Sequence, residues 1–226
     1  ESNPNKSLEA AQKILEYGHD TKDNFLIGFG NCLLSWSKSY ITRNMEDPEK
    51  QKESFEEIIK TSKKAMRLFR IIQHHPGYII SYLYHIEALS NLASIESEPI
   101  TKQRLFEKAT EVIEEGIEYF KEGFKTHLTL LNTSLGLNLR LFAETKLEIE
   151  EKRKSLNQSQ FYFKKNSIQI KELMPYNFHY QSGNYYYLAL TQIDLAKIEK
   201  NLSERISLFE KAIFSLEEAI KIAKEF

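Results

Sequence analysis

The sequence predicts an all-α fold of about nine helices, arranged as tandem antiparallel helix pairs in an α-solenoid. Three observations support this fold class. The 226 residues include only eight glycines and five prolines, which is fewer turn residues than a β-rich fold of this length needs. Between these residues, segments of about 20 to 25 residues carry apolar side chains at helical spacing. The segments also resemble one another at a period of about 51 residues.

The amphipathic pattern is clearest over residues 102–120. The apolar residues of this segment follow the i, i+3, i+4, i+7 spacing of one helix face, and they are Leu105, Phe106, Ala109, Val112, Ile113, Ile117 and Phe120. Glutamates and lysines fill the opposite face. The last segment of the chain repeats the pattern, because residues 208–212 match residues 105–109 one for one. Both segments are therefore predicted to be helices with one side in water.

Two columns of equivalent residues set the phase of the repeat. The first column holds phenylalanines spaced by 51, 55 and 48 residues, at Phe55, Phe106, Phe161 and Phe209. The second holds small residues spaced by 51, 55 and 47 residues, at Gly30, Ser81, Gly136 and Gly183. Both columns place four extra residues in the third pair. Because four residues make about one helical turn, we expect a longer helix or connection there.

The expected elements are a leading helix over 7–17 and four pairs, each an A helix followed by a B helix, in a single domain over 1–226. The pairs cover about 24–73, 77–121, 125–174 and 177–226. The A helices are expected at 24–43, 77–96, 125–153 and 177–200, and the B helices at 48–73, 99–121, 157–174 and 202–226. The turn of the third pair is expected near residues 155–157.

Local signals support several of these boundaries. Asp47 before Pro48 is a helix start with a capping carboxylate and a proline in the first turn. Asn201 is a second predicted N-cap, and Gly18 is expected to punctuate the chain after the leading helix. Gly123 is expected to end a helix in the left-handed conformation.

The A and B helices resemble the tetratricopeptide-repeat pattern, in which a small residue lies inside helix A and an aromatic residue plus alanine inside helix B. The likeness rests on the Phe-Glu-Lys-Ala copies at 106–109 and 209–212, and on the similarity of residues 195–199 to residues 92–96. It covers most of the chain. The family's unit is about 34 residues long, so the longer unit here argues against a transfer of the family's peptide-carboxylate clamp. A subset of such proteins is periplasmic and includes partners of solute transporters.

Composition and motifs argue against several classes of function. The 31 lysines and arginines balance 32 aspartates and glutamates, so the basic excess typical of nucleic-acid binding is absent. Phosphate-binding glycine loops, nucleophile elbows, HExxH motifs and acidic calcium loops are also absent. We therefore expect no enzyme activity, no cofactor and no metal site. No apolar stretch approaches the ~20 residues of a transmembrane helix.

We expect the cysteine and three of the histidines to have structural roles. Cys32 is the only cysteine, which excludes an intrachain disulfide, and we expect it to be a small buried side chain. His74 and His75 are expected to cap the end of the first B helix. His85 is expected to be a partly buried, hydrogen-bonded histidine.

The first residues of the chain carry information about the cellular location of the protein. The chain begins at Glu1 without a methionine, and residues 1–5 form a polar lead-in. This start fits either an exported protein whose signal has been removed or a trimmed chain. The scarcity of cysteine favours an exported or periplasmic bacterial protein over a cytoplasmic one, and the sequence leaves the compartment open.

Polar side chains on the A helices form the candidate binding groove. They are Tyr84 and Asn91 on the second A helix, Asn138 and Arg140 on the third, and Gln181, Asn184 and Tyr187 on the fourth. In stacked helix pairs the A helices line the concave side, and tyrosine and arginine are favoured in binding surfaces. The alternative is that these side chains pack between neighbouring pairs.

The leading hypothesis for function is a non-enzymatic scaffold that binds a protein or peptide on its A-helix surface. One alternative is a structural subunit of a larger assembly or filament, which would expose apolar surface at the ends of the array. Another is a protein that holds a lipid-like ligand, such as a periplasmic ligand-binding protein associated with a transport system. The sequence leaves the oligomeric state open.

Overall fold

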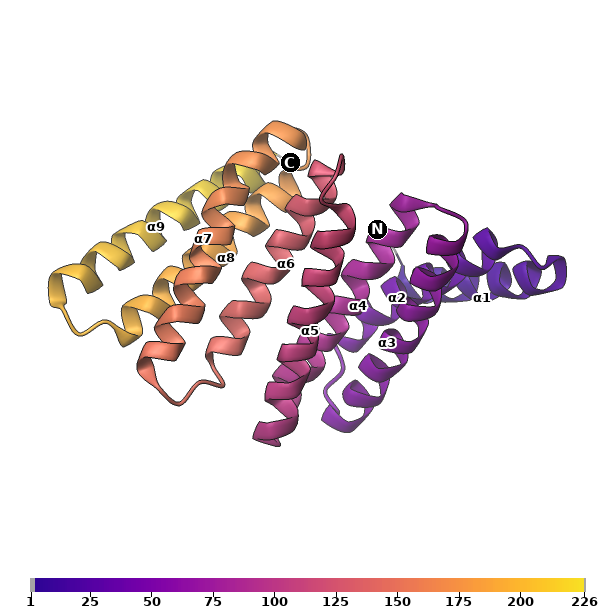
Figure 1. The fold of residues 1–226 in the computed structure, drawn as a ribbon, viewed down its shortest axis with the longest axis horizontal. Coiled ribbons are helices and arrows are strands. Elements are labelled where there is room, and N and C mark those ends of the chain that lie inside the picture. Colours follow the sequence, from indigo (N-terminus) through magenta and orange to yellow (C-terminus); the bar gives the residue numbers. More distant parts are fainter. Residues whose placement is uncertain (1–2, 226) are drawn as a thin grey trace. The chain divides into compact units, whose positions relative to one another are not determined.

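The computed structural model describes residues 3–225, and these form nine α-helices (Figure 1). The helices are α1 (Pro4–Thr21), α2 (Asn24–Thr42), α3 (Pro48–Ile71), α4 (His75–Ile95), α5 (Pro99–Phe120), α6 (Lys125–Ala143), α7 (Ile149–Leu173), α8 (Phe178–Ile198) and α9 (Leu202–Lys224). The all-α class and the tandem antiparallel pairs are confirmed. The expected end of the last helix at Phe226 lies outside the described residues.

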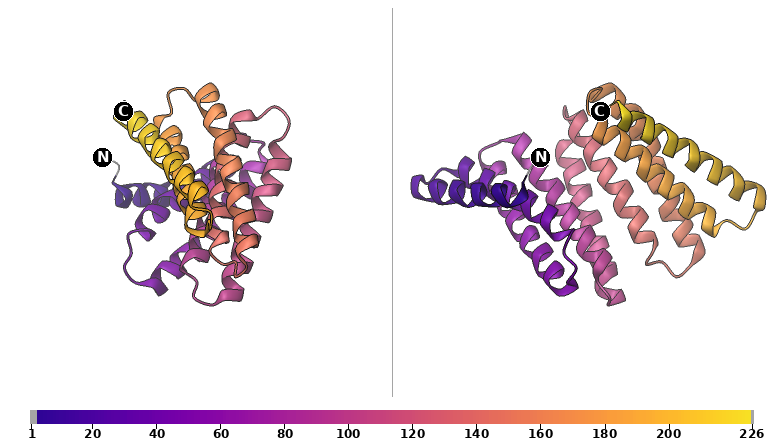
Figure 2. Two further views of the ribbon diagram at one scale, coloured as in Figure 1. Left: turned by 90° about the vertical axis from the view of Figure 1, so that its left-hand side faces the viewer. Right: turned by 180° about the vertical axis from the view of Figure 1, so that it is seen from behind.

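The chain divides into two compact units, Glu1–Ala109 and Thr110–Phe226, and the boundary falls inside α5. In unit 1, α1 packs against α2, α2 against α3 and α3 against α4, and the A helices α2 and α4 also touch. In unit 2, α6 to α9 pack in the same order, and the A helices α6 and α8 touch. Figure 2 shows these neighbours from two further directions. The single domain over 1–226 stays a prediction.

The A helices and the B helices repeat along the chain with the same spacing in all four pairs. The A helices begin at residues 24, 75, 125 and 178, and the B helices at 48, 99, 149 and 202, so both series are spaced by 51, 50 and 53 residues. The same spacing relates four small residues near the ends of the A helices, each at most 1% exposed: Thr42, Ala93, Ala143 and Ala196. The expected insertion of four residues is therefore wrong, although the third pair is the longest, at 53 residues to the start of the next, and contains the longest described helix, α7, with 25 residues.

The turn of the third pair lies about ten residues before its expected position. Helix α6 ends at Ala143 and α7 begins at Ile149, so the predicted turn at residues 155–157 falls inside α7. The connection contains no glycine or proline. Instead, the N–H groups of Glu144, Thr145 and Lys146 each donate to the carbonyl three residues earlier, which satisfies the end of α6 with ordinary residues.

The corrected phase also replaces one member of the phenylalanine column. Phe55 and Phe106 are buried as expected, but the equivalent residue of α7 is Leu156, which is 1% exposed. Phe161, the predicted member, is 60% exposed. The buried phenylalanine of α7 is Phe163, one helical turn beyond Ser159.

Glycines let phenylalanine rings of the B helices approach the A helices. The ring of Phe69 lies between Gly28 on α2 and Gly77 on α4, where a Cβ atom would come within 3.1 Å and 2.7 Å of it. In unit 2, a Cβ atom on Gly136 would lie 3.1 Å from the ring of Phe163. Gly183, the predicted fourth member of the small-residue column, faces open space.

Replacing Gly77 with alanine is expected to lower the free energy of unfolding by about 1–3 kcal/mol, because the new methyl group overlaps the Phe69 ring and the His74 Nδ1 atom. Gly183→Ala is the matched control. It adds a methyl group inside α8 with no neighbour within 4 Å, so we expect it to stabilise the protein by about 0.5–1 kcal/mol. Urea denaturation measures both changes, and equal effects at the two sites would contradict the packing described here.

The helix ends follow most of the sequence signals. The Asp47 side chain accepts from two N–H groups in the first turn of α3, and Asn201 does the same for α9, which confirms both N-caps. Gly123 has a φ of 85°, so its left-handed conformation is confirmed. Gly18 does not end the leading helix. It is buried inside α1, and the left-handed residue after that helix is Lys22, with a φ of 56°.

An ion pair recurs at the same place in both units. In unit 1, Lys52 of α3 pairs with Glu96 after α4 at 2.8 Å. In unit 2, Arg153 of α7 pairs with Glu199 after α8. Lys52 and Arg153 occupy equivalent repeat positions. The backbone N–H of Asn201 and the Arg153 guanidinium lower the pKa of the Glu199 carboxyl to about 2.

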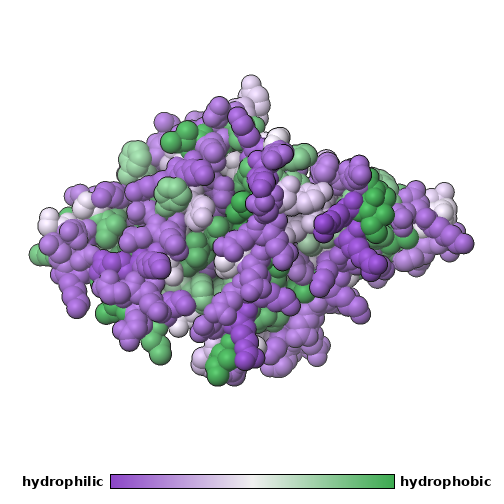
Figure 3. Space-filling model, viewed as in Figure 1, coloured by the Kyte–Doolittle hydropathy of each residue, from purple (hydrophilic) through white to green (hydrophobic). Residues whose placement is uncertain are grey.

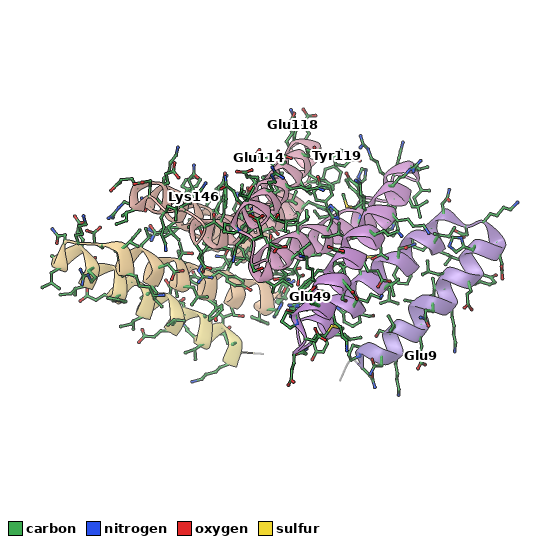
Figure 4. The ribbon with its side chains drawn as sticks, turned by 90° about the horizontal axis from the view of Figure 1, so that it is seen from below. Glu9, Glu49, Glu114, Glu118, Tyr119 and Lys146 are labelled. Atoms are coloured by element: carbon green, nitrogen blue, oxygen red, sulfur yellow. The ribbon has the colours of Figure 1, made fainter. Side chains whose placement is uncertain are left out.

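The outward faces of the helices carry the charged residues that the amphipathic pattern predicted. Glu9 on α1, Glu49 on α3, and Glu114 and Glu118 on α5 are exposed (Figure 4). Figure 3 shows hydrophilic residues over most of the visible face, with hydrophobic residues in scattered patches among them. Across residues 3–225, no helix is both long enough and apolar enough to cross a membrane.

Candidate functional site: an apolar groove between α2 and α4

Unit 1 contains a groove of about 430 Å³ between its two A helices. Its lining is almost wholly apolar and aromatic. Helix α2 contributes Phe25, Phe29, Cys32, Leu33 and Trp36; α3 contributes Phe69; and Pro76, Gly77, Ile80 and Tyr84 come from α4, with His74 just before that helix. A volume of this size is within the range of small binding sites in proteins.

The repeat itself builds the two walls of the groove. Phe29 and Ile80 are 51 residues apart, as are Leu33 and Tyr84, so the walls are equivalent positions on consecutive A helices. These residues recur every four positions and therefore lie on one face of each helix. The Phe69 ring, 1% exposed, forms the floor between the two walls.

The rim of the groove is apolar and open to solvent. Phe25, Phe29 and Ile80 are 41%, 45% and 44% exposed. The rings of Phe25 and Phe29 are parallel, with centroids 6.2 Å apart. Because covering such side chains is favourable by about 25 cal/mol per Å² of apolar surface, this rim provides a driving force for binding.

His74 closes one end of the groove. It does not cap the end of α3, as the sequence suggested, but the start of α4, where its Nδ1 atom accepts the N–H of Gly77 at 3.0 Å. Its ring lies 5.1 Å from the Phe25 ring and 5.2 Å from the Phe69 ring, measured between centroids. The imidazole is therefore held in place by both its polar and its aromatic contacts.

The opposite ends of α2 and α4 are joined by polar side chains. Glu87 of α4 accepts a hydrogen bond from the Ser39 hydroxyl at 3.1 Å and pairs with Arg43 at 2.8 Å. The apolar groove thus gives way to a charged link between the same two helices. In unit 2, Arg140 of α6 and Asp194 of α8 make a comparable link between A helices at 2.8 Å.

Cys32 lies in the wall of the groove and is buried, as expected from the sequence. Burial raises the pKa of its thiol. A raised pKa keeps the thiol protonated near neutral pH, so Cys32 contributes apolar surface to the groove rather than a nucleophile.

Of the two predicted groove residues in unit 1, one lines the apolar groove and the other does not. Tyr84 is half-buried and lines the apolar groove. Asn91 is half-buried near the far end of α4 and does not line it. His85, the neighbour of Tyr84, is buried against α3, where its Nδ1 atom lies 3.1 Å from the Ser62 hydroxyl.

In unit 2, three of the predicted residues donate hydrogen bonds from their side-chain amides to other parts of the same unit. Asn138 donates to the Thr110 hydroxyl at 2.9 Å. Gln181 donates to the carbonyls of the chain before α8, at Met174 and Pro175. Asn184 donates to the Phe163 carbonyl and the Ser167 hydroxyl of α7, both at 2.9 Å.

The last two predicted residues make contacts between helices of unit 2. Arg140 bonds Asp194, and the Tyr187 ring stacks on the Phe163 ring at 6.0 Å. Tyr187 occupies the repeat position of Tyr84, 103 residues earlier. The seven residues are therefore not gathered in one groove of either unit, and their binding role stays a prediction.

Sequence reasoning missed the aromatic residues of α2. Phe25, Phe29 and Trp36 are apolar and helically spaced, a pattern that by itself is typical of core residues. A signal was available, however, since the 51-residue period places them opposite Pro76, Ile80 and Glu87 on the next A helix. Among residues 3–225, no three His, Cys, Asp or Glu side chains gather as a metal site would require.

Comparisons with known proteins assign no family to this chain. No family model matches the chain, and no curated protein matches it. A solved structure described as "Computational Design of Self-Assembling Cyclic Protein Homooligomers" is similar to it, with 15% sequence identity and a TM-score of 0.44. The match covers 98% of this chain and 95% of that chain. The all-helical, repeat-like architecture of the described residues rests on their own helix order.

Proposed function

We propose that the protein is a non-enzymatic binding module, and that the groove between α2 and α4 holds an amphipathic helix of a partner protein. The observation that carries the proposal is the apolar rim of the groove, which leaves Phe25, Phe29 and Ile80 exposed to water. Aromatic side chains in such positions are the usual anchors of protein interfaces. The TPR-like character of the helix pairs, read from the sequence, agrees with this role.

The dimensions of the groove favour a helix as its occupant. The wall on α2 runs from Phe25 to Trp36, which spans about 16 Å at a rise of about 1.5 Å per residue. This length matches three turns of a helix, whose side chains at i, i+4 and i+7 project from one face into a groove. A lipid-like ligand would be largely enclosed by its pocket, whereas the residues that border this groove are themselves exposed.

Ile80→Asp is expected to weaken partner binding at least tenfold, because it places a charged carboxylate against the apolar face of the bound helix. The probes are amphipathic peptides of three to four turns, selected from a displayed library against the full chain. Calorimetry then compares the wild type with Ile80→Asp and with Ile100→Asp. Ile100 is 62% exposed on the part of α5 that belongs to unit 1 and lies outside the groove, so the same substitution there is the matched control.

Two outcomes would reject the proposal. Peptides that bind the wild type and Ile80→Asp equally well occupy another surface. A chain that selects no peptide but binds a long-chain fatty acid, with loss of that binding in Ile80→Asp, is a lipid-binding protein instead. Retained binding in Ile100→Asp, together with loss in Ile80→Asp, supports the helix-binding role.

A further inference from the structure

Helix α9 exposes a continuous apolar stripe along unit 2. Its members are Leu202, Ile206, Phe209, Ile213, Leu216 and Ile220, and all except the half-buried Leu216 are between 40% and 66% exposed. They are spaced by 4, 3, 4, 3 and 4 residues, which is the seam of a helix that packs lengthwise against another helix. Ala212, Ser215, Ala219 and Ile222 form the separate, buried side of α9.

The stripe occupies the repeat positions that join the first pair to the second and the third pair to the fourth. On α7 the equivalent positions contact α8: Arg153 bonds Glu199, Phe163 stacks on Tyr187, and Ser167 accepts from Asn184. On α3 they contact α4, since Lys52 bonds Glu96, Phe55 packs on Leu92, and Ser62 meets His85. The corresponding residues of α9 are Ile206, Phe209, Leu216 and Ile220.

The face of α9 that occupies these positions carries different side chains from the matching faces of α3 and α7. The equivalent residues of α3 and α7 include charged and hydroxyl groups, whereas all six in the α9 stripe are apolar. Figures 1 and 2 show α9 at one edge of unit 2, beside α8. A long contiguous apolar stripe of this kind is typical of interaction surfaces.

We infer that the stripe binds the same stripe of a second copy of this chain, with the two α9 helices antiparallel across a two-fold axis. The spacing of the stripe reads the same in both directions. Leu202 of one copy then faces Ile220 of the other, Ile206 faces Leu216, and Phe209 faces Ile213, so every member is covered in a single register. A surface that complements itself in this way is what a two-fold dimer requires.

Two further observations favour a second copy. The joining faces of α3 and α7 each accept an antiparallel helix, so an antiparallel α9 continues the packing already present within the units. An aromatic side chain buries about 150–250 Å² and an aliphatic one less, so the five members that are 40–66% exposed together present roughly 500 Å² per copy. Two copies then bury about 1,000 Å² before their flanking residues are counted, which is the lower limit for a biological interface.

Ile213→Glu is expected to convert a dimer of the full chain into a monomer, because it places a carboxylate against Phe209 of the other copy. Light scattering after size-exclusion chromatography, across the micromolar range, measures the mass, and circular dichroism checks that the variant is folded. The matched control is Ile168→Glu, since Ile168 is 73% exposed on α7 and lies outside the stripe. A dimeric wild type, a monomeric Ile213→Glu variant and a dimeric Ile168→Glu variant support the inference.

A wild type that stays monomeric, or a folded Ile213→Glu variant that stays dimeric, overturns it. Orientation is tested with Leu202→Cys and Ile220→Cys variants. Leu202 lies about 27 Å from Ile220 along α9, so in the antiparallel dimer neither variant links to itself, whereas a mixture of the two forms a disulfide. Self-linking of Leu202→Cys overturns the antiparallel arrangement. Because the stripe and the groove are separate, either proposal can fail while the other stands.

Discussion

Phe163→Ala is expected to lower the free energy of unfolding by about 3–5 kcal/mol, the usual cost of removing a fully buried phenylalanine ring. The ring is inaccessible to solvent, lies against Gly136 of α6 and stacks on Tyr187 of α8. Its removal leaves a cavity that three helices line. Urea denaturation followed by circular dichroism measures the change.

Phe161→Ala is the matched control for this prediction. Phe161 lies two residues earlier on the same helix and is 60% exposed, so we expect its replacement to change stability by at most about 0.5 kcal/mol. The pair of variants tests the phase of the repeat directly, because the irregular spacing read from the sequence would bury Phe161 instead. A larger loss in Phe161→Ala than in Phe163→Ala would contradict the regular spacing.

Unit 1 is expected to lose about 3 kcal/mol of stability between pH 7.5 and pH 4 through His85 alone. Burial lowers the pKa of His85 to about 4, from an ordinary value of 6.5. The fold therefore favours the neutral imidazole. The resulting stabilisation is complete above pH 6.5, where His85 is also neutral in the unfolded chain, and it is lost as the pH falls toward 4.

The hydrogen bonds of His85 fit the neutral form. Its Nδ1 atom lies 3.2 Å from the Ile59 carbonyl, which can only accept, so this atom carries a proton. The Ser62 hydroxyl donates to the Ile58 carbonyl at 2.6 Å and can accept from the same imidazole N–H. A second proton, on Nε2, would place a positive charge in the buried contact between α3 and α4.

The measurement is urea denaturation at pH 7.5 and pH 4, followed by the fluorescence of Trp36, which lies in unit 1. His85→Gln removes the titrating group, so the difference in unfolding free energy between the two pH values should shrink by about 3 kcal/mol relative to the wild type. An unchanged difference in the variant would show that His85 is not the group responsible.

The sequence was sufficient to predict the fold class and most helix boundaries, because local signals for them are strong. Amphipathic spacing marks the helices, and capping residues such as Asp47 and Asn201 mark where they begin. The turn between α6 and α7 was missed because it has no glycine or proline, and its helix end is satisfied by the N–H groups of Glu144–Lys146. The phase of the third pair was wrong for a separate reason, because Phe161 was aligned with Phe106 in place of the buried Leu156.

The candidate site was harder to predict, for a physical reason. Buried amides must be hydrogen-bonded, and Asn138, Gln181 and Asn184 meet this need through neighbouring helices and loops. Polar residues on the A helices thus looked like a binding surface but bond within the fold. Apolar residues at helical spacing usually belong to the core, but Phe29 and Ile80 are among the more exposed side chains of their helices. Exposure depends on the packing of whole helices, which residue spacing alone does not determine.

The location of the bound helix is the central claim, and Trp36 reports on it directly. It is the only tryptophan of the chain, and it lines the groove between α2 and α4. Titration with a selected peptide that lacks tryptophan is expected to shift its emission to shorter wavelength, with saturation at one peptide per chain, because the peptide displaces water from the indole. Binding that calorimetry detects while the emission of Trp36 stays unchanged would contradict the account.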